Sequence, residues 1–314
     1  MIERAMGRRT LLKGGAASIV SLAVAQATVP ALAQPSETQI MEAIERQMIA
    51  LIERVAEPLP DIADAGFARF IDRFADSKVI LLGESTHGTD EFYRARAAIT
   101  ERLVREHGFN IVALEADWPD AARIDAYVRG HSEVPSPITP FQRFPTWMWR
   151  NRAVRAFVDR LHDINRDIEK RERKAGVYGL DLYSLPSSMD AVVDFFQRHD
   201  PEALEGVRKR YGCLAPWVDD LATYGALART PRLDSCAKDV VSVIKDVLNE
   251  RLAHIHASDV ALFDALQNAR VVAASEAYYR AMYESSVASW NLRDMHMFET
   301  LEAVLEARGP EAKA

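Results

Sequence analysis

The stretch KVILLGESTHGTDEFYRAR, residues 78–96, decides the fold class of this chain. It opens with an uninterrupted apolar run, residues 79–82, which is typical of a strand buried on both faces of a parallel sheet. Gly83 ends this run, and a helix is expected to begin near Asp90. In α/β folds, ligands and reacting groups gather in the loop that follows the carboxyl end of such a strand. Residues 83–90 are therefore predicted to carry functional side chains.

Several ionisable side chains follow this strand within thirteen positions, among them Glu84, His87, Glu91 and Arg96. A histidine beside a carboxylate can activate water near neutral pH. We therefore expect His87 to act as a general base next to Glu84. Arg96 lies on the predicted helix, where it could hold a carboxylate or stabilise a developing oxyanion. A structural ion pair to Glu84 or Glu115 is the alternative role for this arginine.

Two further apolar runs, residues 110–114 and 176–180, predict two more strands, and each is followed by an acid, Glu115 and Asp181. The carboxyl ends of parallel strands lie on one edge of the sheet. We expect both acids to join the group after the first strand in a single cleft. The alternative is that each acid caps the helix that follows it.

Helices are predicted between and around these strands. Their expected ranges are 37–56, with a capping box from Ser36 to Gln39, a short helix near 67–74, then 90–107, 120–129 and 150–174. From residue 184 onward the apolar spacing is helical in six segments, 186–198, 201–211, 214–228, 235–252, 258–284 and 290–307. The expected fold class is α/β, a parallel-type sheet with crossover helices plus a large helical region in the C-terminal half, about residues 184–290.

The N-terminal residues 1–33 have the pattern of a secretory signal. Paired arginines, Arg8 and Arg9, precede a small and apolar stretch, and residues 31–33 suit a cleavage site. The arginine pair indicates the twin-arginine route, and a membrane anchor is the alternative. We expect residues 34–314 to form the mature domain, periplasmic or secreted, with no stable membrane anchor after cleavage.

The composition restricts the partners and cofactors. The formal charge of the 314-residue chain is −7, which argues against nucleic acid as a partner. Cys213 and Cys236 could form a disulfide in an oxidising compartment, but we favour two ordinary small apolar residues within helices. Neither has a metal-ligand spacing, and His254 and His256 do not share a helix face. No metal and no cofactor is predicted.

Two aromatic segments are candidates for substrate contact. The connection over residues 131–148 is rich in proline, and Trp147 and Trp149 near its end could line an apolar binding cleft or belong to the core. The segment 289–296 is expected to start the last helix, and its Arg293 could reach the same edge of the sheet.

Five segments, in order along the chain, resemble the erythromycin esterase family. They are LLGESTHGTDEFYRARAAITERLV, GFNIVALEADWPDAARIDAYVRG, FPTWMWRN, VYGLDLYSL and SWNLRDMHM. The resemblance runs from about residue 40 to the end, and is strongest to the large uncharacterised branch of the family. It implies an α/β core with an inserted helical region.

The resemblance also implies a function, the metal-independent hydrolysis of a macrolide lactone by activated water, linked to the response to antibiotics. By position in the motifs, His87 would be the general base, with Glu84, Arg96 and Glu115 as its polar neighbours. Asp181 and Arg293 match further motif positions, and we group them with Trp147 and Trp149 as substrate-binding candidates. A small-molecule ester or macrolide is the expected partner.

One departure from the family bears on this function. Members usually continue into another strand with a tryptophan–x–histidine–asparagine–x–histidine motif, and this sequence stops where that strand would begin. We expect a C-terminally incomplete version of the domain. Two alternatives to an active hydrolase therefore stay open, a truncated non-catalytic ligand-binding protein and a metal- or haem-binding relative.

Overall fold

The computed structural model describes residues 36–131, 140–141, 146–253 and 260–314, without the side chains of residues 249–253. The signal peptide predicted for residues 1–33, most of the proline-rich connection, and the pair His254 and His256 lie outside the described residues. The chain divides into two compact units, Met1–Pro58 and Leu59–Ala314.

The first unit contains helix α1, Glu37–Val55. Its capping box is confirmed, because the Gln39 backbone N–H donates to Ser36 Oγ at 3.3 Å and the Ser36 N–H donates to Gln39 Oε1 at 2.9 Å. Within the described part of the chain, neither this helix nor any other is both long and apolar enough to cross a membrane.

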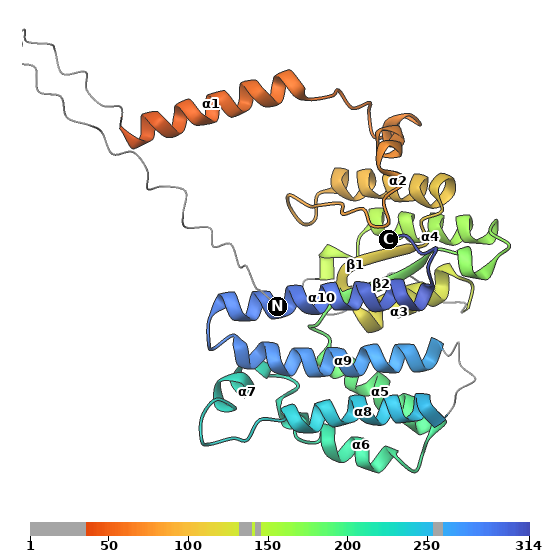
Figure 1. Ribbon diagram of the computed structural model, residues 1–314, viewed down its shortest axis with the longest axis vertical. Coiled ribbons are helices and arrows are strands. Elements are labelled where there is room, and N and C mark those ends of the chain that lie inside the picture. Colours follow the sequence, from red (N-terminus) through yellow and green to blue (C-terminus); the bar gives the residue numbers. More distant parts are fainter. Residues whose placement is uncertain (1–35, 132–139, 142–145, 254–259) are drawn as a thin grey trace, which may run out of the picture. The chain divides into compact units, whose positions relative to one another are not determined.

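The second unit contains a parallel sheet of two strands, β1 (Ile111–Asp117) and β2 (Gly176–Asp181) (Figure 1). Their register pairs Ile111 with Gly176 and continues to Leu114 and Gly179. Both predicted strands are thus confirmed, with one correction. Glu115 lies inside β1 instead of after it, because the strand continues for two residues beyond this acid.

The predicted first strand is not formed as a strand among the described residues. Segment 79–82 has no regular secondary structure, although Ile80 N–H donates to the Ala314 carbonyl at 2.9 Å and Ala314 N–H donates to the Lys78 carbonyl at 3.0 Å. A strand is defined by a sustained ladder of such bonds, and here the ladder stops after one residue. The three-strand expectation is wrong for this reason.

The two faces of the sheet alternate as period-two geometry requires. Val112 and Val177 pack into a core with Val158 and Leu161 of helix α4 (Arg152–Arg166). Ile111 and Tyr178 point to the opposite face, where they pack against residues of α9 (Val260–Ala281) and α10 (Ser286–Arg308). Helices therefore cover both faces, α2 (Asp90–His107) and α4 on one and α9 and α10 on the other (Figure 1). This confirms the α/β fold class with crossover helices.

The helices of the second unit follow the predicted order. Their bounds are η1 Phe67–Phe74, α2 Asp90–His107, α3 Trp118–Val128, η2 Thr146–Met148, α4 Arg152–Arg166, η3 Arg171–Arg173, α5 Leu185–His199, α6 Leu204–Tyr211, η4 Ala215–Trp217, α7 Leu221–Leu227, α8 Ala237–Ala253, α9 Val260–Ala281 and α10 Ser286–Arg308. The helix predicted over 150–174 is shorter, and α10 begins before the predicted residue because Ser285 caps it by accepting from the Ala288 N–H.

The helical region has its own core and a disulfide. Helix α9 packs against α5, α8 and α10, and buried apolar side chains fill the space between them. Cys213, which follows α6, and Cys236, which precedes α8, form a disulfide with their Cα atoms 5.8 Å apart. The preference for two ordinary apolar cysteines is therefore wrong. The two cysteines are 23 residues apart in the sequence, and they meet because α6 packs on α8.

Replacing both cysteines by alanine should lower the free energy of unfolding by about 2–4 kcal/mol, because a crosslink of this loop length restricts the unfolded chain. Denaturant unfolding of the oxidised wild type and of the Cys213→Ala/Cys236→Ala variant measures the difference. Dithiothreitol should destabilise the wild type and leave the variant unchanged. Equal unfolding midpoints of the two oxidised proteins would contradict this prediction.

His296 on α10 is buried and should make the fold sensitive to acid. Burial, with a smaller contribution from the positive charge of Arg270, lowers the pKa of His296 to about 4, from 6.5 in an unfolded chain. Between these two pKa values His296 is protonated in the unfolded chain but not in the folded protein. The free energy of unfolding therefore falls as the pH falls from about 6.5 to 4. The loss reaches roughly 2–3 kcal/mol. Unfolding of the wild type and of His296→Gln at pH 7 and pH 4.5 checks this, because the variant should lose less stability over that interval.

Candidate active site

Three of the predicted catalytic side chains form one cluster. The Glu84 carboxylate lies between the other two, with Oε2 2.9 Å from His87 Nδ1 and Oε1 2.9 Å from Arg96 Nη2. The first contact is a hydrogen bond, and the second is an ion pair whose angles do not suit a hydrogen bond. The end of segment 78–84, the turn at residues 85–88 and the second turn of α2 supply these groups.

This cluster has the geometry of an oriented base. When Glu84 accepts the Nδ1 proton of His87, the neutral imidazole keeps Nε2 as its basic atom. The His87 side chain is 46% exposed, so water and substrate can reach it, whereas Glu84 is largely covered. Arg96 pairs with Glu84 and has further N–H groups to offer a developing oxyanion.

The turn that carries His87 depends on Gly88. This glycine has φ of +80°, the left-handed region that side chains rarely adopt, and a Cβ here would lie 2.8 Å from Cζ3 of Trp147. Trp147 therefore packs directly on the His87–Gly88 turn, and its side chain is half exposed. The structure thus places this predicted substrate-binding tryptophan beside the predicted base.

The other predicted charged residues form a second cluster around Arg293. Arg293 Nε and Nη2 donate to the two carboxylate oxygens of Asp181 at 3.0 and 2.7 Å, and Nη2 also donates to Glu115 Oε1 at 2.6 Å. These residues come from α10, the end of β2 and β1. Desolvation works to lower the pKa of Arg293, but the two carboxylates hold it above its usual value. The guanidinium is therefore charged at every pH at which the protein is folded.

Two aromatic residues lie between the clusters. The Tyr93 hydroxyl donates to the Met148 carbonyl at 2.6 Å and accepts from Gly88 N–H at 3.1 Å, and its ring lies under the Arg96 guanidinium at 5.4 Å. Trp149 packs edge-to-face on Tyr93 and donates from Nε1 to the Glu115 carbonyl at 3.2 Å. Tyr93 thus holds the His87 turn and the Trp149 segment together.

Two site residues were not predicted from the sequence, Tyr93 and Tyr183, and the ring of Tyr183 lies 5.1 Å from the Arg293 guanidinium. The signal for Tyr93 was its position three residues before Arg96, which places both on one face of α2. Tyr183 lies two residues after Asp181, at the end of β2, the position at which functional groups were sought.

The structure therefore brings the predicted site residues together as two groups instead of one. Glu84, His87 and Arg96 form the first, and Glu115, Asp181 and Arg293 the second. Within the part of the chain that the structure describes, no ion pair or hydrogen bond between side chains joins the two groups. The first group follows segment 79–82, and the second lies in and near the last residues of β1 and β2. In the same described ranges, no three acids, histidines or cysteines come close enough to hold a metal ion.

Comparison with known proteins supports the family resemblance of the sequence motifs. The sequence model of the erythromycin esterase family matches residues 104–314. A Bacillus subtilis protein named "Putative hydrolase YbfO" is 23% identical over 198 residues. The match covers 62% of this chain and 42% of the relative, so the chain spans about two fifths of that curated relative.

Solved structures share the fold. A succinoglycan biosynthesis protein gives a TM-score of 0.68 at 20% identity, covering 85% of this chain and 64% of the other. A Bacillus cereus protein gives 0.67 at 20% identity, covering 83% and 63%. A mutant of the erythromycin esterase EreC in its open conformation gives 0.58 at 17% identity, covering 80% and 62%.

The family match covers two thirds of the chain and includes β1, β2 and the Arg293 cluster. The segment with Glu84 and His87 precedes the matched range and belongs to the same compact unit. On this evidence the chain belongs to the erythromycin esterase family.

Proposed function

We propose that this protein hydrolyses a carboxylic ester, with a macrolide lactone as the first candidate substrate, by water that His87 activates. The observation that carries the proposal is the 2.9 Å hydrogen bond between Glu84 and His87 Nδ1, in a solvent-accessible loop beside Arg96. A general base must reach water and hold its ring in one tautomer, and this geometry supports both requirements.

The proposed reaction has two steps. In the first, the water oxygen bonds to the acyl carbon while a water proton passes to His87 Nε2, and Arg96 stabilises the charge that develops on the carbonyl oxygen. In the second, the tetrahedral intermediate collapses, the C–O bond to the alcohol breaks, and the leaving oxygen takes the proton from the His87 imidazolium. Glu84 stabilises the imidazolium between the two steps.

Substrate binding would use the aromatic side of the site. Trp147 is half exposed and packs on the turn that carries His87. Trp149 and Tyr93 form the wall between the two charged clusters. We propose that Trp147 contacts the apolar part of the ester, while Arg293, Asp181 and Glu115 hold the adjacent edge in a fixed, charged arrangement.

We also propose that the protein acts after export, in the periplasm or outside the cell. The basic and apolar N-terminal residues support export, and the Cys213–Cys236 disulfide suits an oxidising compartment. A chain retained in the reducing cytosol would keep both thiols free. Thiol labelling of the protein from fractionated cells separates these cases.

The proposed activity is tested with the chain from Gln34 onward, incubated with macrolides and a panel of model esters and followed by mass spectrometry. Hydrolysis of a lactone adds the mass of one water to the substrate. Circular dichroism on the same sample shows whether the protein is folded. A ring-opened or cleaved product from the folded protein supports the proposal. Ligand binding without product would instead favour the non-catalytic alternative.

A further inference from the structure

A network of buried polar groups links the disulfide to helix α9. Cys236 is fully buried, and its backbone N–H donates to the Tyr224 hydroxyl at 2.9 Å. That hydroxyl in turn donates to Glu276 Oε1 at 2.6 Å. Ser235, the residue before Cys236, donates to the same oxygen at 2.9 Å. The loop that the disulfide holds therefore directs its polar groups to one carboxylate of α9.

The Glu276 carboxylate depends on these donors. Its side chain is only 1% exposed. Among the described residues, Arg280 supplies the other side-chain donors, with Nε at 2.8 Å from Oε1 and Nη2 at 3.0 Å from Oε2. A buried carboxylate is costly to leave without its hydrogen bonds. We therefore expect α9 to loosen around Glu276 when the loop withdraws its two hydroxyl-bearing neighbours.

The same turn of α9 also holds the end of β2. Ser275 Oγ donates to the Leu182 carbonyl, and the hydroxyls of Tyr278 and Tyr183 lie 2.9 Å apart. The ring of Tyr183 lies 5.1 Å from the Arg293 guanidinium. One turn of α9 thus contacts the disulfide-held loop through Glu276 and the Arg293 cluster through the two tyrosines.

The loop between α7 and α8 has few other strong attachments. Its described backbone bonds are local, such as the 2.9 Å bond from Thr230 N–H to the Leu227 carbonyl. Arg229 pairs with Glu284, a side chain that is 55% exposed, and exposed ion pairs contribute little to stability. The disulfide is therefore a principal attachment of this loop to the rest of the helical region.

We propose that the Cys213–Cys236 disulfide positions the Arg293 cluster through α9, and that a dithiol reductant releases this hold. A thiolate of the reductant attacks Sγ of Cys213, the half-buried cysteine, and Cys236 leaves as a thiolate that takes up a proton. The second thiol of the reductant then resolves the mixed disulfide. The reductant is oxidised to one disulfide, and the protein gains two thiols. The site edge at Arg293 is thus fully ordered only in the oxidised protein.

This ordering concerns the folded protein without substrate, so it does not rest on the proposed hydrolysis. If the protein is exported as proposed, the site becomes fully ordered only where a disulfide can form, outside the reducing cytosol. A failure of the coupling would leave the proposed activity standing, and a lack of activity would leave the coupling standing.

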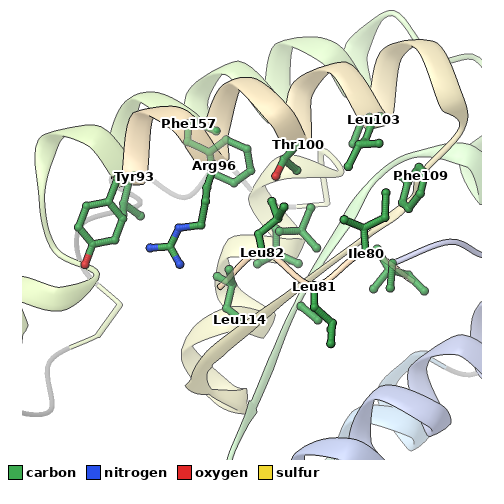
Figure 2. Close-up of a pocket in the computed structure, with 18 of the residues that line it drawn as sticks. Ile80, Leu81, Leu82, Tyr93, Arg96, Thr100, Leu103, Phe109, Leu114 and Phe157 are labelled. Carbon is green, nitrogen blue, oxygen red and sulfur yellow. The ribbon is translucent and has the colours of Figure 1, made fainter. Parts of the chain in front are cut away.

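Hydrogen exchange followed by mass spectrometry tests the coupling on the full chain from Gln34, oxidised and after reduction with dithiothreitol. The reporter is residues 181–189, at the end of β2. The reference is residues 99–107 of α2, on the opposite face of the sheet, where Figure 2 shows Thr100 and Leu103 beside an apolar pocket. Both lie in one compact unit, so the ratio of their exchange rates removes the effect of global unfolding.

Reduction should speed exchange of the reporter, relative to the reference, by about fivefold or more, the effect of losing one ordinary hydrogen bond. Thiol labelling of the denatured samples confirms the redox state, and circular dichroism confirms that the reduced protein is folded. Equal acceleration of reporter and reference would mean that the disulfide stabilises the fold as a whole without positioning the site, and would overturn the proposal.

A matched pair of tyrosine variants locates the path. Tyr224→Phe removes the hydroxyl between Cys236 and Glu276, so its reporter should exchange faster already when oxidised, and reduction should add less than about twofold. Tyr211→Phe removes a buried hydroxyl that has no hydrogen-bond partner among the described residues, and should respond to reduction as the wild type does. A wild-type response of folded Tyr224→Phe would also overturn the proposal. If Tyr224→Phe does not fold, the comparison of oxidised and reduced wild type decides.

Discussion

Replacing His87 by alanine should lower the rate of ester hydrolysis by about 10²–10⁴-fold, the contribution typical of one positioned general base. The physical reason is the loss of the atom that accepts the water proton, while Glu84 and Arg96 remain paired. Because His87 is 46% exposed and sits in a surface loop, its removal should leave the fold intact, with Glu84 still paired to Arg96. The measurement is kcat and KM on the ester that the wild type turns over best.

The matched control for this variant is His199→Ala. His199 is the last residue of α5, also exposed, and lies in the helical region away from the sheet edge. Its replacement should leave turnover within about twofold of the wild type, as expected of surface changes remote from a site. An unchanged rate for His87→Ala, in a folded protein, would remove His87 from the mechanism.

Replacing Arg293 by methionine should lower the free energy of unfolding by about 3–5 kcal/mol, the cost of breaking a buried ion pair by removing one partner. Arg293 is only 7% exposed and satisfies both oxygens of Asp181 and one of Glu115. Without it, the buried Asp181 carboxylate loses its counter-charge. Denaturant unfolding, followed by circular dichroism, measures the change.

Two further variants serve as controls for Arg293→Met. Arg94→Met removes an exposed partner of Asp90, 3.7 Å away, and should cost less than about 1 kcal/mol. Arg293→Lys keeps the charge but loses the bidentate contact with Asp181. Its loss in the free energy of unfolding should lie between those of Arg94→Met and Arg293→Met. If Arg293→Met is as stable as Arg94→Met, the cluster is not the structural anchor that its geometry indicates.

Much of this fold could be predicted from local patterns. The capping box of α1, the left-handed Gly108 after α2, and the order of strands and helices all follow from contacts within a few residues. The absence of regular strand structure at residues 79–82 could not be predicted, because an apolar run shows only that a segment suits a sheet. Whether it forms a strand depends on a neighbour with which it can build a ladder.

In the candidate site, too, some features follow from local sequence patterns and others depend on long-range packing. The position of Asp181 at the end of β2 was predictable from the apolar run before it, whereas the extension of β1 beyond Glu115 was not. Its separation into two clusters was not, because that depends on how Tyr93 and Trp149 pack between Arg96 and Glu115. The Cys213–Cys236 disulfide could not be predicted for a similar reason, because it depends on the packing of two helices.

In the proposed mechanism Glu84 and His87 act as one catalytic unit, and a double-mutant cycle measures whether they do. Ester turnover is measured for the wild type, Glu84→Gln, His87→Ala and the double variant. We predict that the double variant is no slower than His87→Ala within about twofold, because the oriented base is already lost and residues that act as a unit are not additive. Losses that multiply would show that Glu84 and His87 act independently, and no loss in His87→Ala would show that His87 is not the base.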